Sequence, residues 1–146
     1  MNFKKLVFLT KTDTTIGFIS QNNNKLNKIK NRPKNKKFIT AIDSINSINK
    51  LTRIPLTHKK RVRRAVKTTF VIKDESFRVV KDKRHLLLLN RLGWAYTTSA
   101  NLSGKKYNED FAKENADVII SPLDLKIKKA SAIFKLGKKN IKRLRA

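Results

Sequence analysis

Hydroxyl and amide side chains gather in one octapeptide of the chain, at a position where phosphate chemistry is feasible. The run is Thr97-Thr98-Ser99-Ala100-Asn101-Leu102-Ser103-Gly104, and it follows an apolar stretch, Trp94-Ala95-Tyr96, that is typical of a strand. Such side chains hydrogen-bond phosphate oxygens, and Gly104 lets the backbone turn closely past a ligand. The same residues also suit an ordinary strand-to-helix turn. The octapeptide alone leaves both interpretations open.

Two more clusters upstream carry groups that bind anions. They are Thr12-Asp13-Thr14 and Lys30-Asn31-Arg32-Pro33. An arginine forks onto a carboxylate or phosphate, whereas a lysine supplies a movable point charge. The residue before Pro33 is biased toward extended geometry, which lets Lys30 and Arg32 point the same way. Taken alone, the pair is better explained as two surface charges among 36 lysines and arginines.

Composition excludes several other kinds of chemistry. The 146 residues include no cysteine and two histidines, His58 and His85, neither of which lies in a His/carboxylate cluster. Disulfides and thiolate metal sites are therefore excluded, and we expect no metal site. The sequence has no G-x-x-x-x-G-K-S/T loop, which argues against a P-loop ATPase. Met1–Leu9 has too short an apolar run for a signal peptide, and no stretch is long enough to span a membrane, so we expect a cytoplasmic protein.

The net charge is extreme. There are 36 Lys and Arg against 10 Asp and Glu, giving +26. A chain of this charge attracts polyanions in a salt-dependent way, so tRNA or other RNA is an expected partner through a basic surface. The densest basic runs are His58–Arg64 and Lys138–Arg145. A solvated face and a coding bias toward Lys, Asn and Ile remain the alternatives.

Apolar periodicity predicts alternating strands and helices. The expected strands are Lys5–Leu9, Phe38–Ile42, Thr69–Ile72, Phe77–Val80, Trp94–Thr98, Val118–Ile120, Ala132–Lys135 and Ile141–Leu144. The expected helices are Asn22–Ile29, one from about Ser44, His58–Val66, one carrying Leu86–Leu89 between Asp82 and Gly93, and Tyr107–Asn115. No repeat or linker divides the chain, so we expect a single α/β domain over residues 1–146.

Taken in order, these motifs resemble the YrdC-like family, the threonylcarbamoyl-adenylate synthases. The family's S-A-N-x-S-G and K-x-R-P motifs are intact, and its late S-T-I resembles Ser131-Ala132-Ile133. Partial matches are Lys11–Phe18 to P-T-D/E-T-V-Y-G-L, Thr69 to P-G-P-x-T, Arg78-Val79 to R-V-P, and Leu144-Arg145-Ala146 to I-L-R-x-G. Lys11 and Ile16 replace the Pro and Tyr of the first of these. The resemblance implies a short, divergent member that lacks the family's N-terminal segment.

The resemblance implies a YrdC-like fold, a twisted mixed sheet flanked by helices with a concave basic face. It also implies synthesis of threonylcarbamoyl-AMP and pyrophosphate from L-threonine, bicarbonate and ATP, for threonylcarbamoyladenosine (t6A) in tRNA. ATP is then a substrate together with Mg²⁺, and there is no permanently bound cofactor. The residues implied as catalytic are Lys30 and Arg32; those implied to bind substrate or ATP are Thr12, Thr14, Lys36, Thr69, Arg78, Thr98, Ser99, Asn101, Ser131 and Arg145.

Two other function classes remain open. A non-catalytic RNA-binding relative would keep the basic concave face without synthase activity, and the lost Pro, Tyr and P-G-P favour it. A ribosome-associated basic protein would need none of the polar motifs. The synthase requires Lys30, Arg32, Ser99 and Asn101 to converge on one pocket, whereas the other two classes do not.

Overall fold

One mixed β-sheet organises the chain. The computed structural model describes residues 2–12, 14–32, 36–48, 50–123 and 130–145, so Asp13 and Pro33 of the sequence motifs lie outside the described residues. The sheet has the order β7-β1-β2-β6-β3-β5-β4-β8-β9. Its strands are β1 (Phe8–Lys11), β2 (Ile16–Ser20), β3 (Ile39–Ile42), β4 (Thr68–Ile72), β5 (Glu75–Val79), β6 (Trp94–Ser99), β7 (Val118–Ile119), β8 (Ala132–Leu136) and β9 (Ile141–Arg145). Parallel pairing joins β1 to β7, β3 to β5 and β4 to β8; the other neighbours are antiparallel.

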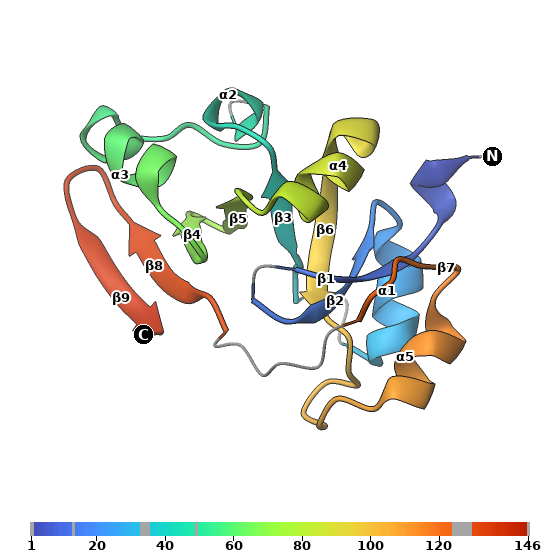
Figure 1. The fold of residues 1–146 in the computed structure, drawn as a ribbon. Helices are drawn as coiled ribbons and strands as arrows, with labels where there is room; N and C mark the ends of the chain where they lie inside the picture. Colours follow the sequence, from blue (N-terminus) through green and yellow to red (C-terminus); the bar gives the residue numbers. More distant parts are fainter. Residues whose placement is uncertain (1, 13, 33–35, 49, 124–129, 146) are drawn as a thin grey trace.

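Helices flank the sheet, as Figure 1 shows. They are α1 (Asn23–Lys30), α2 (Ile45–Ile48), α3 (Lys59–Arg64), α4 (Lys83–Leu92) and α5 (Glu109–Asn115). Asp82 and Asn108 cap the N-termini of α4 and α5, because Asp82 accepts from the His85 N–H and Asn108 from the Phe111 N–H. In the described part of the chain, no helix has the length and apolarity needed to cross a bilayer.

Strand alternation assigns the helices to the two faces of the sheet. Phe8 and Ile19 pack with the buried leucines of α4, whereas Leu9 and Phe18 pack with α1 and α5. Ile42 faces away from α4 as well, in the cluster that contains residues of α2 and α3. Since successive strand residues point to opposite faces, α4 covers one face and the other four helices cover the opposite one.

The first strand begins three residues later than the sequence predicts. A 3₁₀ helix (Phe3–Lys5) includes the first residue of the predicted strand Lys5–Leu9, and β1 begins only at Phe8. The side chain of Asn2 accepts from the Lys4 N–H and so stabilises this turn. The pattern analysis also missed β2, which lies between β1 and β6 at the centre of one half of the sheet.

Candidate functional site

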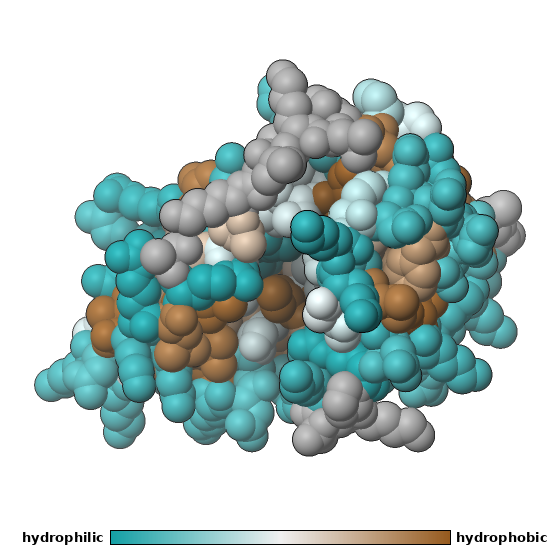
Figure 2. Space-filling model, turned by 90° about the horizontal axis from the view of Figure 1, so that it is seen from below, coloured by the Kyte–Doolittle hydropathy of each residue, from teal (hydrophilic) through white to brown (hydrophobic). Residues whose placement is uncertain are grey.

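A cavity of about 190 Å³ opens on the face of the sheet that carries α4. It lies beyond the part that the helix covers, because Ile39 and Thr97 line it while their neighbours along the same face, Ala41 and Ala95, pack with α4. Viewed from below, the molecule is hollowed near its centre, with hydrophilic residues on several sides of the hollow and hydrophobic ones beside them (Figure 2). The lining residues are Thr14, Thr15, Arg32, Lys37, Ile39, Arg78, Thr97, Thr98, Ser99, Ala130, Ser131 and Arg145.

One residue expected to be catalytic, Arg32, and six of those expected to bind substrate or ATP line this one cavity. They come from segments far apart in the sequence: Thr14, Arg32, Arg78, Thr98, Ser99, Ser131 and Arg145. Four cationic side chains reach it, and no Asp or Glu is among the described residues that line it. A cavity with cations and hydroxyl groups but without carboxylates is suited to an anionic ligand.

The turn between β1 and β2 is organised by Thr12. Its Oγ1 donates to the Thr15 carbonyl at 2.6 Å and accepts from the N–H groups of Thr14 and Thr15 at 3.3 and 3.2 Å. Thr12 is buried and does not line the cavity. Its place in the structure is that of a turn-forming residue that presents Thr14 and Thr15.

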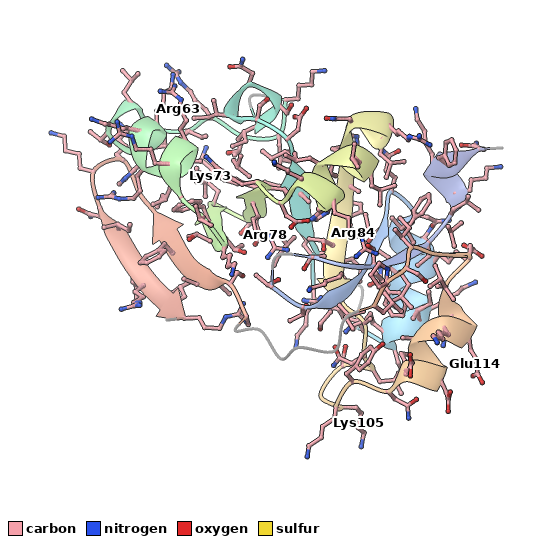
Figure 3. All side chains as sticks on the ribbon, in the orientation of Figure 1. Arg63, Lys73, Arg78, Arg84, Lys105 and Glu114 are labelled. Atoms are coloured by element: carbon pink, nitrogen blue, oxygen red, sulfur yellow. The ribbon has the colours of Figure 1, made fainter. Side chains whose placement is uncertain are left out.

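Arg78 extends from β5 toward that turn (Figure 3). Its Nη1 donates to the Thr14 Oγ1 at 3.1 Å, and only 4% of the residue is exposed. Gly17 explains how β2 comes so close to β6, because a Cβ at this position would lie 2.9 Å from the Thr98 carbonyl oxygen. The family-like glycine therefore serves strand packing beside the site.

A register shift in the last hairpin directs Arg145 to the cavity. Arg143 pairs with Phe134, but Arg145 pairs with Ile133, so β9 contains one extra residue at this point. A bulge of this kind turns the following side chain to the other face. Arg145 then donates from Nε to the Ser131 carbonyl at 2.8 Å and from Nη2 to the Ser131 Oγ at 3.1 Å.

Thr69 lies behind Ser131. The two hydroxyl oxygens are 2.9 Å apart, and Thr69 is 1% exposed. It does not line the cavity itself. Thr69 can orient the Ser131 hydroxyl, and through it the guanidinium of Arg145.

Lys30 lies in the wall of the site rather than in the cavity. Its Nζ donates to the Ser99 carbonyl at 2.8 Å and to Asn101 Oδ1 at 3.3 Å, and the Ser103 N–H donates to the Lys30 carbonyl at 3.3 Å. Asn101 in turn donates from Nδ2 to the carbonyls of Leu102 and Lys105. Lys30 and Asn101 thus hold the 99–105 loop against the end of α1.

Arg32 is positioned by the end of α1. Asn31 adopts a left-handed conformation (φ 51°) at the helix C-cap, and the Arg32 N–H donates to the Asn27 carbonyl. The Arg32 guanidinium lies over the Phe38 ring, 4.8 Å from its centroid. Burial lowers the pKa of Arg32 from its usual value.

Lys36 and Lys37 were not distinguished by the sequence. Lys36, the predicted residue, is exposed and does not line the cavity, whereas Lys37 lines it and forms an ion pair with Glu75 at 3.2 Å. The other lining residues that we missed are Thr15, Ile39, Thr97 and Ala130. Thr97 could have been inferred, because strand alternation places it on the same face as Ser99. Ile39 pairs with Thr97 across β3 and β6 and so lies on that face too.

The stability of the protein should depend on pH through Lys30. Burial, and then the positive charge of Arg32, lower the pKa of Lys30 from 10.5 to about 8. The unfolded chain therefore binds more protons between these two values, and the free energy of unfolding should rise with pH across this window. For Lys30 the gain is at most about 3 kcal/mol.

Denaturant titrations of wild type and Lys30→Met at pH 7 and pH 10 test this expectation. Between pH 7 and pH 10 the wild type should gain more stability than the variant, since the variant lacks the buried Lys30 amine that loses its proton over this range. Comparing the two proteins cancels the falling repulsion among the other lysines. Equal gains in both proteins would show that Lys30 is not the group responsible.

Comparison with known proteins identifies the family. A sequence profile of the Sua5/YciO/YrdC family, which carries the description "Telomere recombination", matches residues 4–146. The chain belongs to the Sua5/YciO/YrdC family. The YrdC-like resemblance seen in the sequence motifs is thereby confirmed.

Solved structures of this family share the fold. P. abyssi Sua5 in complex with L-threonine has a TM-score of 0.79 and 19% identity, covering 96% of this chain and 50% of that one. E. coli YciO has a TM-score of 0.71 and 17% identity, covering 96% of this chain and 82% of that one. The predicted α/β architecture, a twisted mixed sheet flanked by helices, is confirmed.

A curated relative is closer in sequence. The uncharacterized protein MG259 of Mycoplasma genitalium is 32% identical over 107 residues, which cover 69% of this chain and 22% of that protein. The Sua5/YciO/YrdC chain described here thus spans about a fifth of the Mycoplasma protein and half of P. abyssi Sua5.

Proposed function

We propose that the chain is a nucleotidyltransferase that forms threonylcarbamoyl-AMP from L-threonine, bicarbonate and ATP in the cytoplasm, for the t6A modification of tRNA. The observation that supports this most is that Arg32 and Ser99 line one cavity together with other cations and hydroxyl groups, while Lys30 and Asn101 lie beside it in the wall. Membership in the Sua5/YciO/YrdC family and the threonine complex of P. abyssi Sua5 support it further.

The proposed reaction needs an anion to approach another anion. The amine of threonine takes up bicarbonate with loss of water, and an oxygen of the resulting carbamate attacks the α-phosphorus of ATP. A new P–O bond forms, the bond to the β-phosphate oxygen breaks, and pyrophosphate leaves. Such a step depends on preorganised positive charge and hydrogen-bond donors more than on a strong base.

The side chains of the cavity fit these requirements. Arg32 from the end of α1, Arg78 from β5 and Arg145 from β9 bring guanidinium groups to the cavity, and these forks match phosphate or carboxylate oxygens. The hydroxyls of Thr98 and Ser99 offer neutral donors for threonine and the nucleotide. Mg²⁺ would enter with ATP on its phosphate oxygens.

Lys30 and Asn101 take a different role in this proposal from the one implied by the resemblance. Their contacts are to the backbone and side chains of the 99–105 loop. We assign them to positioning Ser99. Loss of either side chain should therefore act mainly by altering the geometry of the 99–105 loop, and less by changing the charge in the cavity.

Release of pyrophosphate provides the test. With ATP, L-threonine and bicarbonate together, the protein should release pyrophosphate, and omission of threonine or bicarbonate should abolish the release. The β9 strand offers a matched pair of variants, since Arg145 lines the cavity whereas Arg143 lies over the Phe134 ring. Arg145→Ala should lower the rate by about tenfold or more, as expected for loss of one charge-stabilising group, and Arg143→Ala should not. Equal effects of the two substitutions, or release that does not depend on threonine, would contradict the proposal.

One observation favours the alternative, a non-catalytic RNA-binding member. Ile16 occupies the position of the family's tyrosine, and its half-buried side chain packs with the cluster of α1 and α5 instead of offering a hydroxyl. A protein that binds RNA but shows no ATP-dependent release of pyrophosphate would support this alternative. The charge of +26 fits both functions.

A further inference from the structure

A second cavity, of about 440 Å³, lies on the opposite face of the sheet from the candidate site. Strand alternation separates the two: Ile39 of β3 lines the candidate site, and its neighbour Thr40 lines the second cavity. The second cavity lies between two parts of the core on this face. Tyr96 packs with the cluster of α1 and α5, whereas Ile42 and Leu51 pack with that of α2 and α3.

Aromatic and aliphatic side chains form most of this cavity. Trp94 and Tyr96 line it with their ring centroids 5.1 Å apart at an interplanar angle of 82°. Trp94 is 38% exposed, which is unusual for so large an apolar ring in a strand. Ile42 and Leu51 complete the apolar lining. An open aromatic ring beside an aliphatic surface can stack against a flat heterocycle.

Two opposite charges accompany the aromatic rings. Asp43 and Lys50 both line the cavity. The Asp43 carboxylate accepts from the Ser47 hydroxyl at 2.8 Å, which holds it in place but leaves further acceptor capacity. An ionised carboxylate only accepts hydrogen bonds, so it favours a heterocycle with an amino group over one with a carbonyl oxygen. The ammonium group of Lys50 can bind a phosphate.

We propose that this cavity binds a nucleotide whose base carries an exocyclic amino group, as adenine does. The base stacks on Trp94, its amino group donates to Asp43, and its phosphate lies near Lys50. The cavity volume falls within the range of ordinary small-molecule sites. A free nucleotide and an unpaired adenosine in RNA share this chemistry, and the experiment below separates these two sources.

The chain supplies its own reporter. Trp94 is the single tryptophan of the sequence, so its fluorescence reports on this cavity. A series of ring contacts also joins it to the candidate site, through Tyr96 and Phe38 to the guanidinium of Arg32. A nucleotide bound in the candidate site could therefore alter the same signal. The titrations are done in an Arg32→Ala background for this reason.

The test compares AMP with IMP. The base of AMP carries an exocyclic amino group where the base of IMP carries a carbonyl oxygen, and this is the group that we propose faces Asp43. We expect AMP to change Trp94 emission saturably, with an affinity about tenfold above that of IMP, the worth of one hydrogen bond to a charged group. A short oligoadenylate that binds much more tightly than AMP, with steep salt dependence, would identify RNA as the source. Equal affinities of oligoadenylate and AMP would identify the free nucleotide.

Two substitutions with matched controls decide whether the proposed residues are responsible. Lys50→Gln should weaken AMP binding by about tenfold, and Asp43→Asn should remove the preference for AMP over IMP. Lys73→Gln and Asp74→Asn change exposed residues of the β4–β5 turn and should have no effect. The proposal is overturned if neither AMP nor oligoadenylate changes Trp94 emission saturably. It is also overturned if binding is the same in the Asp43 and Lys50 variants as in their controls.

Discussion

Replacing Arg32 with alanine is expected to weaken ATP binding by about 1.5–3 kcal/mol, the worth of a hydrogen bond to a charged group. The guanidinium lines the candidate cavity and is held over the Phe38 ring. The Arg32 side chain therefore loses little conformational entropy when a phosphate binds. Loss of the cation–π contact should cost about 0.5–1 kcal/mol of stability. Calorimetry measures the ATP affinity, and denaturant titration measures the stability.

Arg53→Ala is the matched control, because Arg53 is an exposed arginine outside the cavity lining. The control should bind ATP as the wild type does. If a folded Arg32→Ala variant also binds ATP with unchanged affinity, Arg32 does not belong to the nucleotide site. A variant that loses both stability and affinity would be resolved by Arg32→Lys, which keeps the charge but not the fork.

The sequence motifs bring together residues that line one cavity although they are far apart along the chain. Arg78 and Ser131 are 53 positions apart in the numbering, yet both line the same cavity. Neither residue would stand out among so many basic and hydroxyl side chains by local pattern alone. Their order along the chain, relative to the intact S-A-N-x-S-G motif, was what identified them.

Details below the level of the motif were not predictable in the same way. The segment Ile16–Ser20 carries a glycine and polar neighbours, which weaken its strand pattern, although tertiary pairing with β1 and β6 makes it a central strand. The motif also gave no indication that Lys30 is buried in the wall. That placement follows from the end of α1 packing against the 99–105 loop.

Arg145 shows the limit of periodicity. Strict alternation from Ile141 and Arg143 would put Arg145 on the same face as Arg143, away from Ser131. The extra residue in β9 reverses this placement. A bulge depends on pairing with a distant strand, so a local hydrophobic pattern does not reveal it.

RNA binding and ATP binding should respond to different substitutions. At +26 the protein should bind tRNA in a strongly salt-dependent way whether or not it is a catalyst. Helix α3 carries a dense exposed group of cations, and none of its residues lines the candidate cavity. We expect the triple variant Lys60→Gln, Arg63→Gln, Arg64→Gln to lose RNA affinity and to reduce the salt slope by about 2–3 units if all three contact phosphates. Arg61 is kept, because its Nη1 lies 2.8 Å from the Nδ1 of buried His58.

Arg32→Ala and Asn101→Ala should give the reverse result, with a large loss of ATP affinity and little change in RNA affinity. Arg32 lines the cavity directly, whereas Asn101 holds the loop that carries Ser99. Titrations with ATP and with RNA at two salt concentrations make the comparison, since the affinity for RNA falls steeply as salt is added. If the α3 variant also loses ATP, the basic helix and the cavity form one continuous binding surface. If the wild type binds RNA but neither ATP nor threonine, the cavity is a remnant of the family site and the RNA-binding function is the correct one.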